Sequence, residues 1–387
     1  MKKINIGLFI DTFYPMIDGV ILVVDNYAKR LSKYANVYVF APRIPHEKFD
    51  DSKFNYNVIR CNSIDIFFLD YALPLPDLDK KFKRKIDECN LDIIHIHSPA
   101  TLGNVGIKYA KKNNIPVVAT LHSQYKQDFL RVTHSKIISN ILTKHITKLF
   151  EKCDECWTLN KDIERVFHDE YGYTKKIRII NNATDMTPST NRKKSIERIN
   201  KLHSINNNEK VLLFVGRINR LKNIDLIINS LVYLKIKYKM LFVGVGQDED
   251  YIKKLIEKNQ LNKNVIFCGK VDDRELLKDY YVRADLFLFP SLYDTNSLVQ
   301  IEAASQQTPT LFVENAVTAS KVTKDVDGYF SKNNPKDYAK KIEEIFSDKN
   351  SYNEVCKNAY NNLYNNWDDE VKRIYNLYLN LIESRDK

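Results

Sequence analysis

The sequence predicts an α/β protein made of two Rossmann-like, doubly wound domains that face each other across a cleft. Three observations support this prediction. Short apolar runs alternate with stretches of helical periodicity, the same alternation restarts in the second half of the chain, and a polar, basic stretch separates the two halves. This alternation is typical of βαβ units, in which helices cover both faces of a mostly parallel sheet. With 387 residues, the chain is long enough for two separate cores.

The first half contains five apolar runs that predict buried strands. Stretches with helical spacing separate them, such as 24–35 and 101–114. The expected strands cover residues 4–10, 37–42, 56–61, 92–97 and 115–122. We therefore expect one mostly parallel sheet, covered by helices, within residues 1–187.

The same order of elements restarts at residue 210. The expected strands cover residues 210–217, 239–246, 264–269, 285–291 and 309–314. The expected helices cover residues 223–235, 248–260 and 273–284, with another opening over 299–305. The polar, basic stretch 188–208 predicts a linker, so we expect the second domain over residues 209–366.

Composition restricts the class of partner. The chain has 60 basic and 49 acidic residues and a net charge of +11. A positive chain suits an anionic partner such as a membrane surface, a nucleic acid or a phosphorylated ligand, but a general bias towards Lys and Asn explains the charge equally well. The sequence holds no nucleic-acid recognition motif, so that class is disfavoured.

The glycine, cysteine and apolar content indicates where backbone geometry matters and in which compartment the chain is expected. Only 10 glycines are present, so each marks a position where backbone geometry can require one. The apolar run at the N-terminus breaks at Asp11 with no cleavage site after it, and no run approaches the ~20 residues that cross a bilayer. We expect a cytosolic chain with six reduced thiols. Cys153 and Cys156 form a lone CxxC pair, for which a metal or redox role is not favoured.

Charged residues follow the predicted strands of the second half. Arg217 closes a strand after Gly216, and Lys222 opens the next helix. Two cations beside a helix N-terminus suit a diphosphate, and the simpler interpretation is a pair of solvated surface cations. Asp294 follows another strand, and Glu302 lies in the first turns of the next helix. These carboxylates suit the hydroxyls of a sugar or ribose, and the simpler interpretation is a turn residue and a helix N-terminal acid.

These motifs resemble glycosyltransferase family 4, whose members have the two-domain GT-B fold. The similarity covers essentially the whole chain. It is carried by Gly216-Arg217, Lys222-Asn223, the run from Pro290-Ser291 through Asp294 to Glu302-Ala303, and the loop Asn181-Asn182-Ala183-Thr184-Asp185. Within the family, the chain is most similar to bacterial diacylglycerol glucosyltransferases and surface-polysaccharide glycosyltransferases.

The resemblance implies donor-binding roles for the matching residues. Arg217 and Lys222, after Gly216, would hold the donor diphosphate and offset charge on the leaving nucleotide. Asp294 would bind hydroxyls of the transferred sugar, and Glu302 those of the ribose. The backbone amides that would surround the sugar or a phosphate belong to Asn296, Ser297, Leu298 and Val299. The base would lie near Lys270 and Val271.

The resemblance also implies site residues in the first half. The glycine loop of the family corresponds to Asp18-Gly19-Val20, which makes Gly19 a donor-site residue. The substrate-facing histidine corresponds to His122, which joins Arg217, Lys222 and Asp294 as a catalytic residue. His97 and Tyr125 are expected on the acceptor side. For both histidines, the alternative is a strand-end imidazole satisfied by backbone.

The implied activity is transfer of a hexose with retention of anomeric configuration and without a metal cofactor. The expected donor is UDP-glucose or a similar UDP-hexose, and the expected acceptor is diacylglycerol or a lipid-linked glycan. Residues 1–187 would bind the acceptor, residues 209–366 the donor, and the amphipathic tail 367–387 would pack back on the first domain. The alternatives are a surface-polysaccharide glycosyltransferase with another donor and a non-catalytic GT-B partner subunit.

The second alternative arises because four family glycines are replaced. Asp18, Ala183, Ser297 and Gln307 stand at those positions, and Asp294 is one methylene shorter than the family's glutamate. A replaced glycine matters where the backbone needs positive φ or close approach.

Two basic amphipathic helices are expected to bind an anionic membrane, which would place the protein peripherally on its cytoplasmic face. Helix 77–88 aligns three apolar residues among five cations, and helix 135–150 aligns five apolar residues with lysines beside them. The apolar, irregular stretch 65–76 is a third indication. The alternative is that both are ordinary Rossmann helices with one solvated face.

Overall fold

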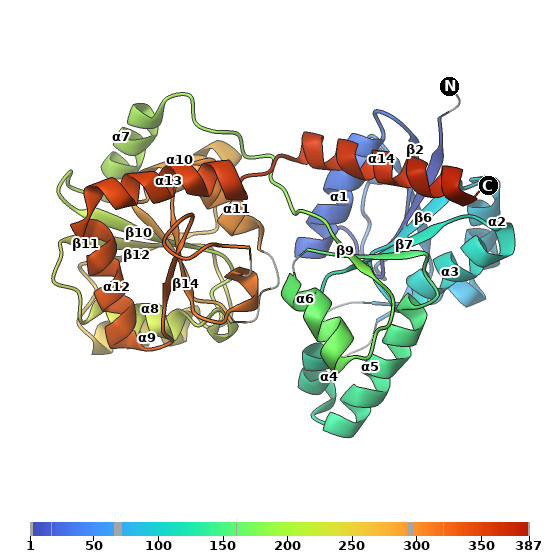
Figure 1. Cartoon of the computed structure of the whole chain (residues 1–387), viewed down its shortest axis with the longest axis horizontal. Helices are drawn as coiled ribbons and strands as arrows, with labels where there is room; N and C mark the ends of the chain where they lie inside the picture. The colour runs from blue at the N-terminus through green and yellow to red at the C-terminus, as the bar shows by residue number, and fades with distance from the viewer. Residues whose placement is uncertain are drawn as a thin grey trace. The chain divides into compact units, whose positions relative to one another are not determined.

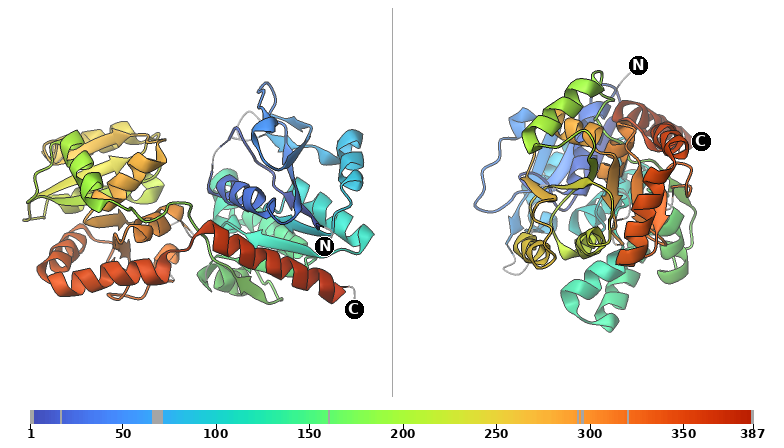
Figure 2. Two further views of the ribbon diagram at one scale, coloured as in Figure 1. Left: turned by 90° about the horizontal axis from the view of Figure 1, so that it is seen from above. Right: turned by 90° about the vertical axis from the view of Figure 1, so that its left-hand side faces the viewer.

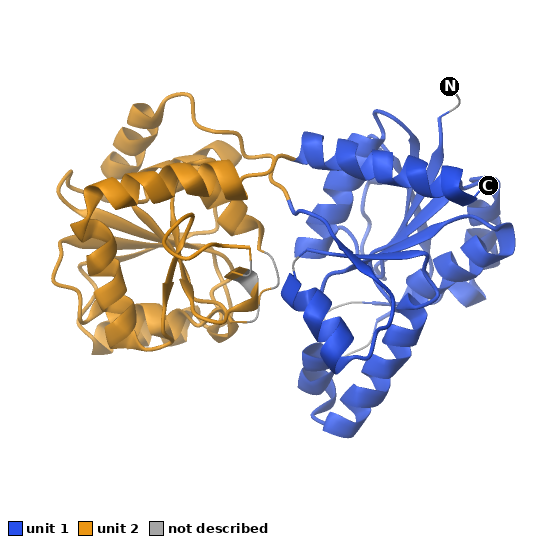
Figure 3. Cartoon of the chain, viewed as in Figure 1, with its two compact units in different colours: residues 1–182, 367–387 blue, residues 183–366 orange. Residues whose placement is uncertain are grey.

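In the computed structural model, the described residues are 3–16, 18–65, 72–159, 161–292, 294, 297–319 and 321–385. They form two compact units (Figures 1 and 3). Unit 1 contains Met1–Asn182 and Trp367–Lys387, and unit 2 contains Ala183–Asn366. Each unit is a Rossmann-like α/β domain around a parallel sheet, which confirms the predicted fold class.

Unit 1 is built on a seven-stranded sheet in the order β3-β2-β1-β6-β7-β8-β9. Every neighbouring pair is parallel. The strands are β1 (Asn5–Phe9), β2 (Asn36–Pro42), β3 (Asn57–Cys61), β6 (Ile93–Ile96), β7 (Val117–Leu121), β8 (Glu155–Thr158) and β9 (Ile177–Ile179). All residues of β6 and β7 are buried, because helices cover both faces of the sheet (Figure 1).

The helices of unit 1 follow the strands in the expected alternation. They are α1 (Gly19–Leu31), α2 (Lys80–Glu88), α3 (Thr101–Asn113), α4 (Tyr125–Thr133), α5 (Lys136–Phe150), α6 (Lys161–Arg165) and α14 (Trp367–Arg385). Shorter elements are η1 (Asp51–Lys53), η2 (Pro76–Leu78), the π-helix η3 (Val166–Glu170) and the antiparallel pair β4 (Ser63–Ile64) and β5 (Leu73–Pro74).

The C-terminal helix α14 belongs to unit 1 and packs against α1. Its Trp367 ring lies edge-on to the Tyr27 ring of α1, with centroids 5.7 Å apart. Its Tyr378 is fully buried and places its hydroxyl 2.6 Å from Nδ1 of His95 in β6. The last helix of the chain therefore completes the core of the first domain.

Unit 2 is built on a six-stranded parallel sheet in the order β12-β11-β10-β13-β14-β15. The strands are β10 (Lys210–Val215), β11 (Tyr238–Val243), β12 (Val265–Gly269), β13 (Leu286–Phe289), β14 (Thr310–Val313) and β15 (Tyr329–Ser331). Alternate residues of β10 face opposite sides: Leu212 and Phe214 join one buried cluster, and Leu213 and Val215 join the other. The sheet therefore separates two apolar cores.

Helices cover both faces of this sheet (Figure 2). They are α7 (Arg192–His203), α8 (Ile224–Leu231), α9 (Glu249–Lys258), α10 (Arg274–Arg283), α11 (Leu298–Ser305), α12 (Pro335–Ser347) and α13 (Lys349–Leu363), with the short η4 (Arg220–Lys222) and η5 (Val317–Ala319). Sequence analysis assigned no element to residues 315–366, where the structure has β15, α12 and α13. The start signal of α12 was present: Asn334 caps it and Pro335 follows at its first position.

The prediction of a linker over 188–208 is wrong. Most of this stretch is the helix α7, which packs against α10 within unit 2. Gln306 holds the segment before it, since its side chain accepts from the Ser189 amide at 2.9 Å and its carbonyl accepts from Arg192 at 2.6 Å. The sequence looked like a linker because the buried stripe of α7 is narrow and Ile199 is its fully buried apolar residue.

Helix α2 corresponds to the alternative interpretation of 77–88 as an ordinary helix with a solvated face. Phe82 and Ile86 are 1% and 2% exposed, so its apolar stripe faces the core of unit 1. Of the apolar stretch 65–76, residues 66–71 lie outside the described part of the chain. In the part that the structure describes, no helix combines the length and apolarity needed to cross a membrane.

We expect Ile199→Ala to lower the free energy of unfolding by about 2–5 kcal/mol, because it leaves a cavity under α7. Leu202→Ala is the matched control on the same helix, where the side chain is 56% exposed, and should change stability by less than about 0.5 kcal/mol. Chemical denaturation measures both. Equal, small effects would mean that α7 does not stabilise unit 2.

Candidate functional site

In unit 2, strand β10 lies between β11 and β13, so the chain runs away from β10 in opposite directions along the sheet. The loops after β10 and β13 therefore diverge at the carboxyl edge, which is the usual ligand position in such sheets. The loop after β10 carries Gly216, Arg217 and η4, and the loop after β13 leads into α11. These are the loops that hold the predicted donor-binding residues.

Glycines allow the backbones after β10 and β11 to remain in contact beyond the strands. Gly216 and Gly244 have φ values of +152° and +135°. A Cβ on Gly244 would lie 2.0 Å from the Gly216 carbonyl oxygen, and a Cβ on Gly246 would lie 2.2 Å from that of Ile218. Both positions need glycine, because the close approach leaves no room for a side chain.

Lys222 and Asp294 are brought together although they are far apart in the chain. The Lys222 Nζ donates to Asp294 Oδ1 at 2.5 Å. Asn223, in the left-handed conformation at φ +56°, donates from Nδ2 to the Pro290 carbonyl at 3.2 Å and so holds the two loops together. The second Asp294 oxygen, Oδ2, is buried and has no partner among the described residues.

Arg217 lies on the loop that follows β10, and its side chain is exposed. Within the described residues, its guanidinium forms no ion pair and no hydrogen bond. The structure therefore places the predicted Arg217 and Lys222 on one loop at the switch point, which is the place between β10 and β13 where the loops diverge. Of these two cations, Lys222 is the one that pairs with a carboxylate among the residues described.

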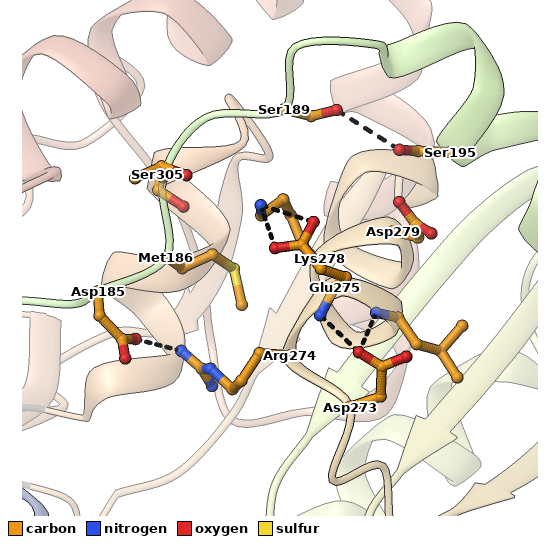
Figure 4. A network of polar contacts seen from close by, with 12 residues as sticks. Asp185, Met186, Ser189, Ser195, Asp273, Arg274, Glu275, Lys278, Asp279 and Ser305 are labelled. Carbon is orange, nitrogen blue, oxygen red and sulfur yellow. Dashed lines mark hydrogen bonds and ion pairs between the residues drawn. The ribbon is translucent and has the colours of Figure 1, made fainter.

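Glu302 is buried in α11 and holds two donors. Its Oε1 accepts from Arg274 Nη2 at 2.9 Å, and its Oε2 accepts from the Tyr281 hydroxyl at 3.0 Å. The same Arg274 nitrogen donates to Asp185 Oδ1 at 2.8 Å, and Figure 4 shows the Arg274–Asp185 ion pair. The sequence carried no signal for Arg274 and Tyr281, because both belong to α10 and only the packing of α10 on α11 places them beside Glu302.

Burial raises the pKa of Glu302, and the Arg274 guanidinium opposes that effect. Burial and the adjacent Glu302 carboxylate raise the pKa of Tyr281. The phenol therefore stays protonated and donates a hydrogen bond to Glu302. An ionised carboxylate has about four acceptor sites. Glu302 can therefore accept from a ligand as well as from these two donors.

The N-terminus of α11 is not capped by the side chain of its own N-cap residue. Ser297, at its N-cap with φ −78°, makes no side-chain capping bond, and the first turn contains no acidic residue. The first amides of a helix have no partner inside it and attract negative charge, here around Ser297, Leu298 and Val299. The fourth predicted residue of this segment, Asn296, lies outside the described residues.

The segment expected to meet a base lies after β12. Val271 is partly buried and packs against an apolar core cluster of unit 2. Lys270 forms an exposed ion pair with Asp272 at 2.8 Å. Contact of this segment with a ligand stays a prediction.

Unit 1 has the same topological switch, between β1 and β6. Asp11 follows β1 and caps α3, accepting from the Leu102 amide at 2.8 Å, from the Thr101 hydroxyl at 2.8 Å and from the Ala100 amide at 3.2 Å. Sequence analysis gave Asp11 no role, although an acid directly after a buried strand was the available signal. The N-terminus of α3 is thus satisfied within the protein.

Gly19 is the first residue of α1, which Asp18 caps through the Ile21 amide at 2.8 Å. A Cβ on Gly19 would meet nothing within 4 Å, so the fold itself does not require glycine there. The open space beside Gly19 is compatible with the close approach of a ligand.

Three buried histidines lie close together: His95 within β6, His97 directly after β6, and His122 directly after β7. His97 Nδ1 is 3.1 Å from His122 Nε2, and His95 bonds Tyr378 and the Thr120 hydroxyl, the latter at 2.7 Å. Burial lowers the pKa of His122 to about 3, and lowers those of His95 and His97 as well. All three imidazoles are therefore neutral at physiological pH. Sequence analysis named His97 and His122 but gave His95 no role.

The alternative interpretation of His97 supposed that backbone groups satisfy its imidazole. The structure shows no backbone partner for this ring among the described residues. Its Nδ1 meets another imidazole, and its buried Nε2 has no partner among the described residues. Tyr125, at the start of α4, has its ring centroid 5.9 Å from that of Phe150. Burial raises the pKa of Tyr125, so its phenol is protonated.

The replaced glycines are mostly tolerated. Asp18 has φ −145° and Ser297 has φ −78°, which any residue adopts. Ala183 has no positive φ either, whereas Gln307 has φ +60°. Only Gln307 therefore carries the cost of a left-handed conformation, about 1–2 kcal/mol.

Two family models match this chain. "Glycosyltransferase Family 4" matches residues 17–187, and "Glycosyl transferases group 1" matches residues 195–362. The alpha-monoglucosyldiacylglycerol synthase of Acholeplasma laidlawii is 28% identical over 353 residues and covers 85% of each chain. The enzyme of that name from Streptococcus pneumoniae is 25% identical over 315 residues, with 79% of this chain and 70% of that one covered.

Solved structures share the fold. Sucrose-phosphate synthase from Thermosynechococcus elongatus superposes with a TM-score of 0.81 at 20% identity, covering 99% of this chain and 100% of that one. Anabaena HepE in complex with UDP and glucose superposes with a TM-score of 0.74 at 17% identity, covering 97% and 99%.

We expect Arg274→Met to destabilise the protein more at pH 8 than at pH 5. The raised pKa of Glu302 means that folding favours its protonated form, and this contribution to stability is lost as pH rises through the folded-state pKa. Without Arg274, the ionised carboxylate at pH 8 is buried without a cation, at a cost of about 1–2 kcal/mol for a half-exposed partner. At pH 5, uptake of a proton removes most of this cost.

Thermal unfolding of wild type and variant at both pH values measures the effect. Arg198→Met is the control, because Arg198 pairs with Asp279 on the surface and has no contact with Glu302. A pH-independent difference for Arg274→Met would contradict the assignment of Arg274 as the counter-ion of Glu302.

Proposed function

We propose that this chain, a GT-B glycosyltransferase, transfers a hexose from a UDP-sugar to a membrane lipid. A Glycosyltransferase Family 4 domain is followed in it by a group 1 glycosyltransferase domain. The proposed donor is UDP-glucose or a similar UDP-hexose. The proposed acceptor is diacylglycerol or a lipid-linked glycan. Retention of anomeric configuration and independence of a metal cofactor are part of the proposal.

The observation that carries the proposal is the ion pair between Lys222 and Asp294, which joins the loop after β10 to the loop that leads into α11. Arg217 is exposed on the same loop as Lys222. A diphosphate needs cations and amide donors, and both are present here. Because an ammonium group has three donors, Lys222 can keep Asp294 and still bind a phosphate oxygen. Positive charge at this place would stabilise the nucleotide as it leaves.

The carboxylates suit the hydroxyl groups of such a donor. Asp294 Oδ2 is buried without a partner among the described residues, so it can accept from a sugar hydroxyl. Glu302 is proposed to accept from the ribose. Its hydrogen bonds to Arg274 and Tyr281 fix the position of the carboxylate and so reduce the entropy lost on binding.

The neutral imidazole of His122 is proposed to bind a substrate hydroxyl. With its pKa lowered to about 3, the His122 imidazole carries no charge at neutral pH. His97 would hold the ring through the contact of 3.1 Å. Gly19, with open space beside it, and Tyr125 are proposed on the substrate side of unit 1.

The lipid acceptor is proposed because two relatives that align with most of this chain are named alpha-monoglucosyldiacylglycerol synthases. The alternative of a non-catalytic partner subunit rests on the replaced glycines. Three of the four replacements have ordinary backbone angles, so this reason has little weight.

The test is release of nucleotide from a panel of sugar nucleotides, with and without vesicles that contain diacylglycerol and anionic lipid. We expect one UDP-hexose to be turned over, at a rate that rises with diacylglycerol and is unchanged by EDTA. Turnover that ignores diacylglycerol would remove the lipid acceptor from the proposal, and loss of turnover in EDTA would remove metal independence. No turnover of any donor would contradict the proposal as a whole.

Lys222→Ala should lower turnover by an order of magnitude or more, because it removes a cation from the proposed diphosphate site and leaves Asp294 unpaired. Lys254→Ala is the matched control, since Lys254 is exposed on α9 and has no ion pair among the described residues. Steady-state kinetics with the donor found above, and thermal unfolding of both variants, separate activity from stability. Near-normal turnover in Lys222→Ala would place the diphosphate elsewhere.

A further inference from the structure

Exposed apolar side chains gather at the tip of the α4–α5 hairpin. The exposed residues are Leu130 (37%), Val132 (53%), Ile137 (73%), Ile138 (47%) and Ile141 (62%). They lie within twelve consecutive residues at the turn between the two helices, and Figures 1 and 2 show this hairpin projecting from the rest of unit 1. Exposed apolar residues that are clustered in this way mark an interaction surface, whereas single ones do not.

The exposed isoleucines are not the core face of their helix. α5 buries another face, with Ile146, Leu149 and Phe150 in the core of unit 1. At about 100° per residue, Ile137 and Ile141 fall on one line of the opposite face. Lys144 and Lys148 continue this line.

An α-helix rises about 1.5 Å per residue, so Lys144 and Lys148 lie on average about 10 Å further along the helix axis than Ile137 and Ile141. Both lysines are exposed, and neither forms an ion pair with any described residue. An apolar tip followed by ammonium groups at this spacing matches the boundary of a bilayer. Apolar side chains can enter the acyl region by 5–10 Å, and lysines then reach the phosphate layer.

This distribution of charge selects the occupant. A second copy of the chain on a twofold axis would present the same patch, and residues 129–150 contain no acidic residue that could pair with these lysines. An anionic bilayer attracts the same lysines, at about 1 kcal/mol for each cation near the surface. The arrangement therefore favours an anionic lipid surface over a second copy.

Helix α2 lacks this arrangement although it is equally basic. Its apolar residues Phe82 and Ile86 are buried, and two of its cations are paired, Lys83 with Asp77 at 3.3 Å and Arg84 with Glu88 at 3.5 Å. Of the two helices expected to bind a membrane, the structure thus distinguishes α5.

We propose that the tip of the α4–α5 hairpin, residues 130–141 with Lys144 and Lys148, is the surface by which this protein docks on an anionic membrane. The proposal rests on the proposed function in one respect, an acceptor that resides in the bilayer. Docking through unit 1 would hold the domain with the proposed acceptor residues His97 and Tyr125 at the membrane.

Binding of the full chain to vesicles tests the proposal without any sugar donor. The probes are phosphatidylglycerol-containing vesicles and pure phosphatidylcholine vesicles, and the variants are Ile137→Ser/Ile138→Ser/Ile141→Ser and Lys144→Glu/Lys148→Glu. We expect wild type to prefer the anionic vesicles and each variant to lose at least tenfold in partition coefficient. Lys81→Glu/Lys85→Glu is the matched control, with the same charge change at the same spacing on α2, and should lose less than threefold.

A second readout reports insertion directly. Trp157 and Trp367 are buried, so a tryptophan introduced by Ile137→Trp gives the exposed indole signal. We expect a blue shift of its emission on anionic vesicles and quenching by brominated lipid. The changed positions are exposed, so unfolding temperatures should stay near that of wild type.

Three outcomes would overturn the proposal: unchanged binding in both hairpin variants, equal loss in the α2 control, or an Ile137→Trp signal that lipid does not alter. A dimer without lipid that the isoleucine variant abolishes would instead assign this surface to a second copy. Normal vesicle binding with no sugar transfer would leave docking intact and contradict the proposed function alone.

Discussion

In both units, the first strand, β1 or β10, lies inside the sheet. The next two strands are added on one side of it, and the later strands of the sheet are added on its other side. This topology opens two loops at one edge and points helix N-termini at the same place. In unit 1, the protein fills that place itself, because Asp11 accepts from the first residues of α3. In unit 2, the corresponding helix α11 has no side-chain cap among the described residues, and Lys222 and Asp294 meet beside it. The same constraint thus gives one helix N-terminus that the protein caps itself and one that has no side-chain cap among the described residues.

Burial has opposite consequences for the titratable groups of the two units. In unit 2, Glu302 is buried with a guanidinium and a phenol, so an ionic group is held in place by its partners. In unit 1, His95, His97 and His122 are buried beside one another, and desolvation lowers the pKa of each. Unit 2 therefore offers charge to a ligand, and unit 1 offers neutral hydrogen bonds. This division suits a nucleotide diphosphate on one unit and uncharged hydroxyls on the other.

The positive charge of the chain does not by itself identify a surface. α2 and α5 have similar numbers of lysines and similar periodicity in the sequence, but they differ in what they bury. α2 buries its apolar stripe, whereas α5 exposes three isoleucines and carries two lysines that form no ion pair with the described residues. Whether an apolar residue faces a core or solvent depends on what packs against its helix. Hydrophobic periodicity alone cannot distinguish these two cases.

The sequence by itself determined the α/β class, the parallel strands of both units, the loops that hold Arg217, Lys222 and Asp294, and the helix that holds Glu302. Strand runs and strand-end residues are local features, so they can be read without a fold. Only the tertiary structure decided that Arg274 and Tyr281 hold Glu302, that His95 joins Tyr378 of the last helix, and that 188–208 contains a packed helix and not a linker. These features depend on contacts between elements that are distant in the chain. Burial sets both the pKa values and the exposed surfaces, and it exists only after those elements have packed.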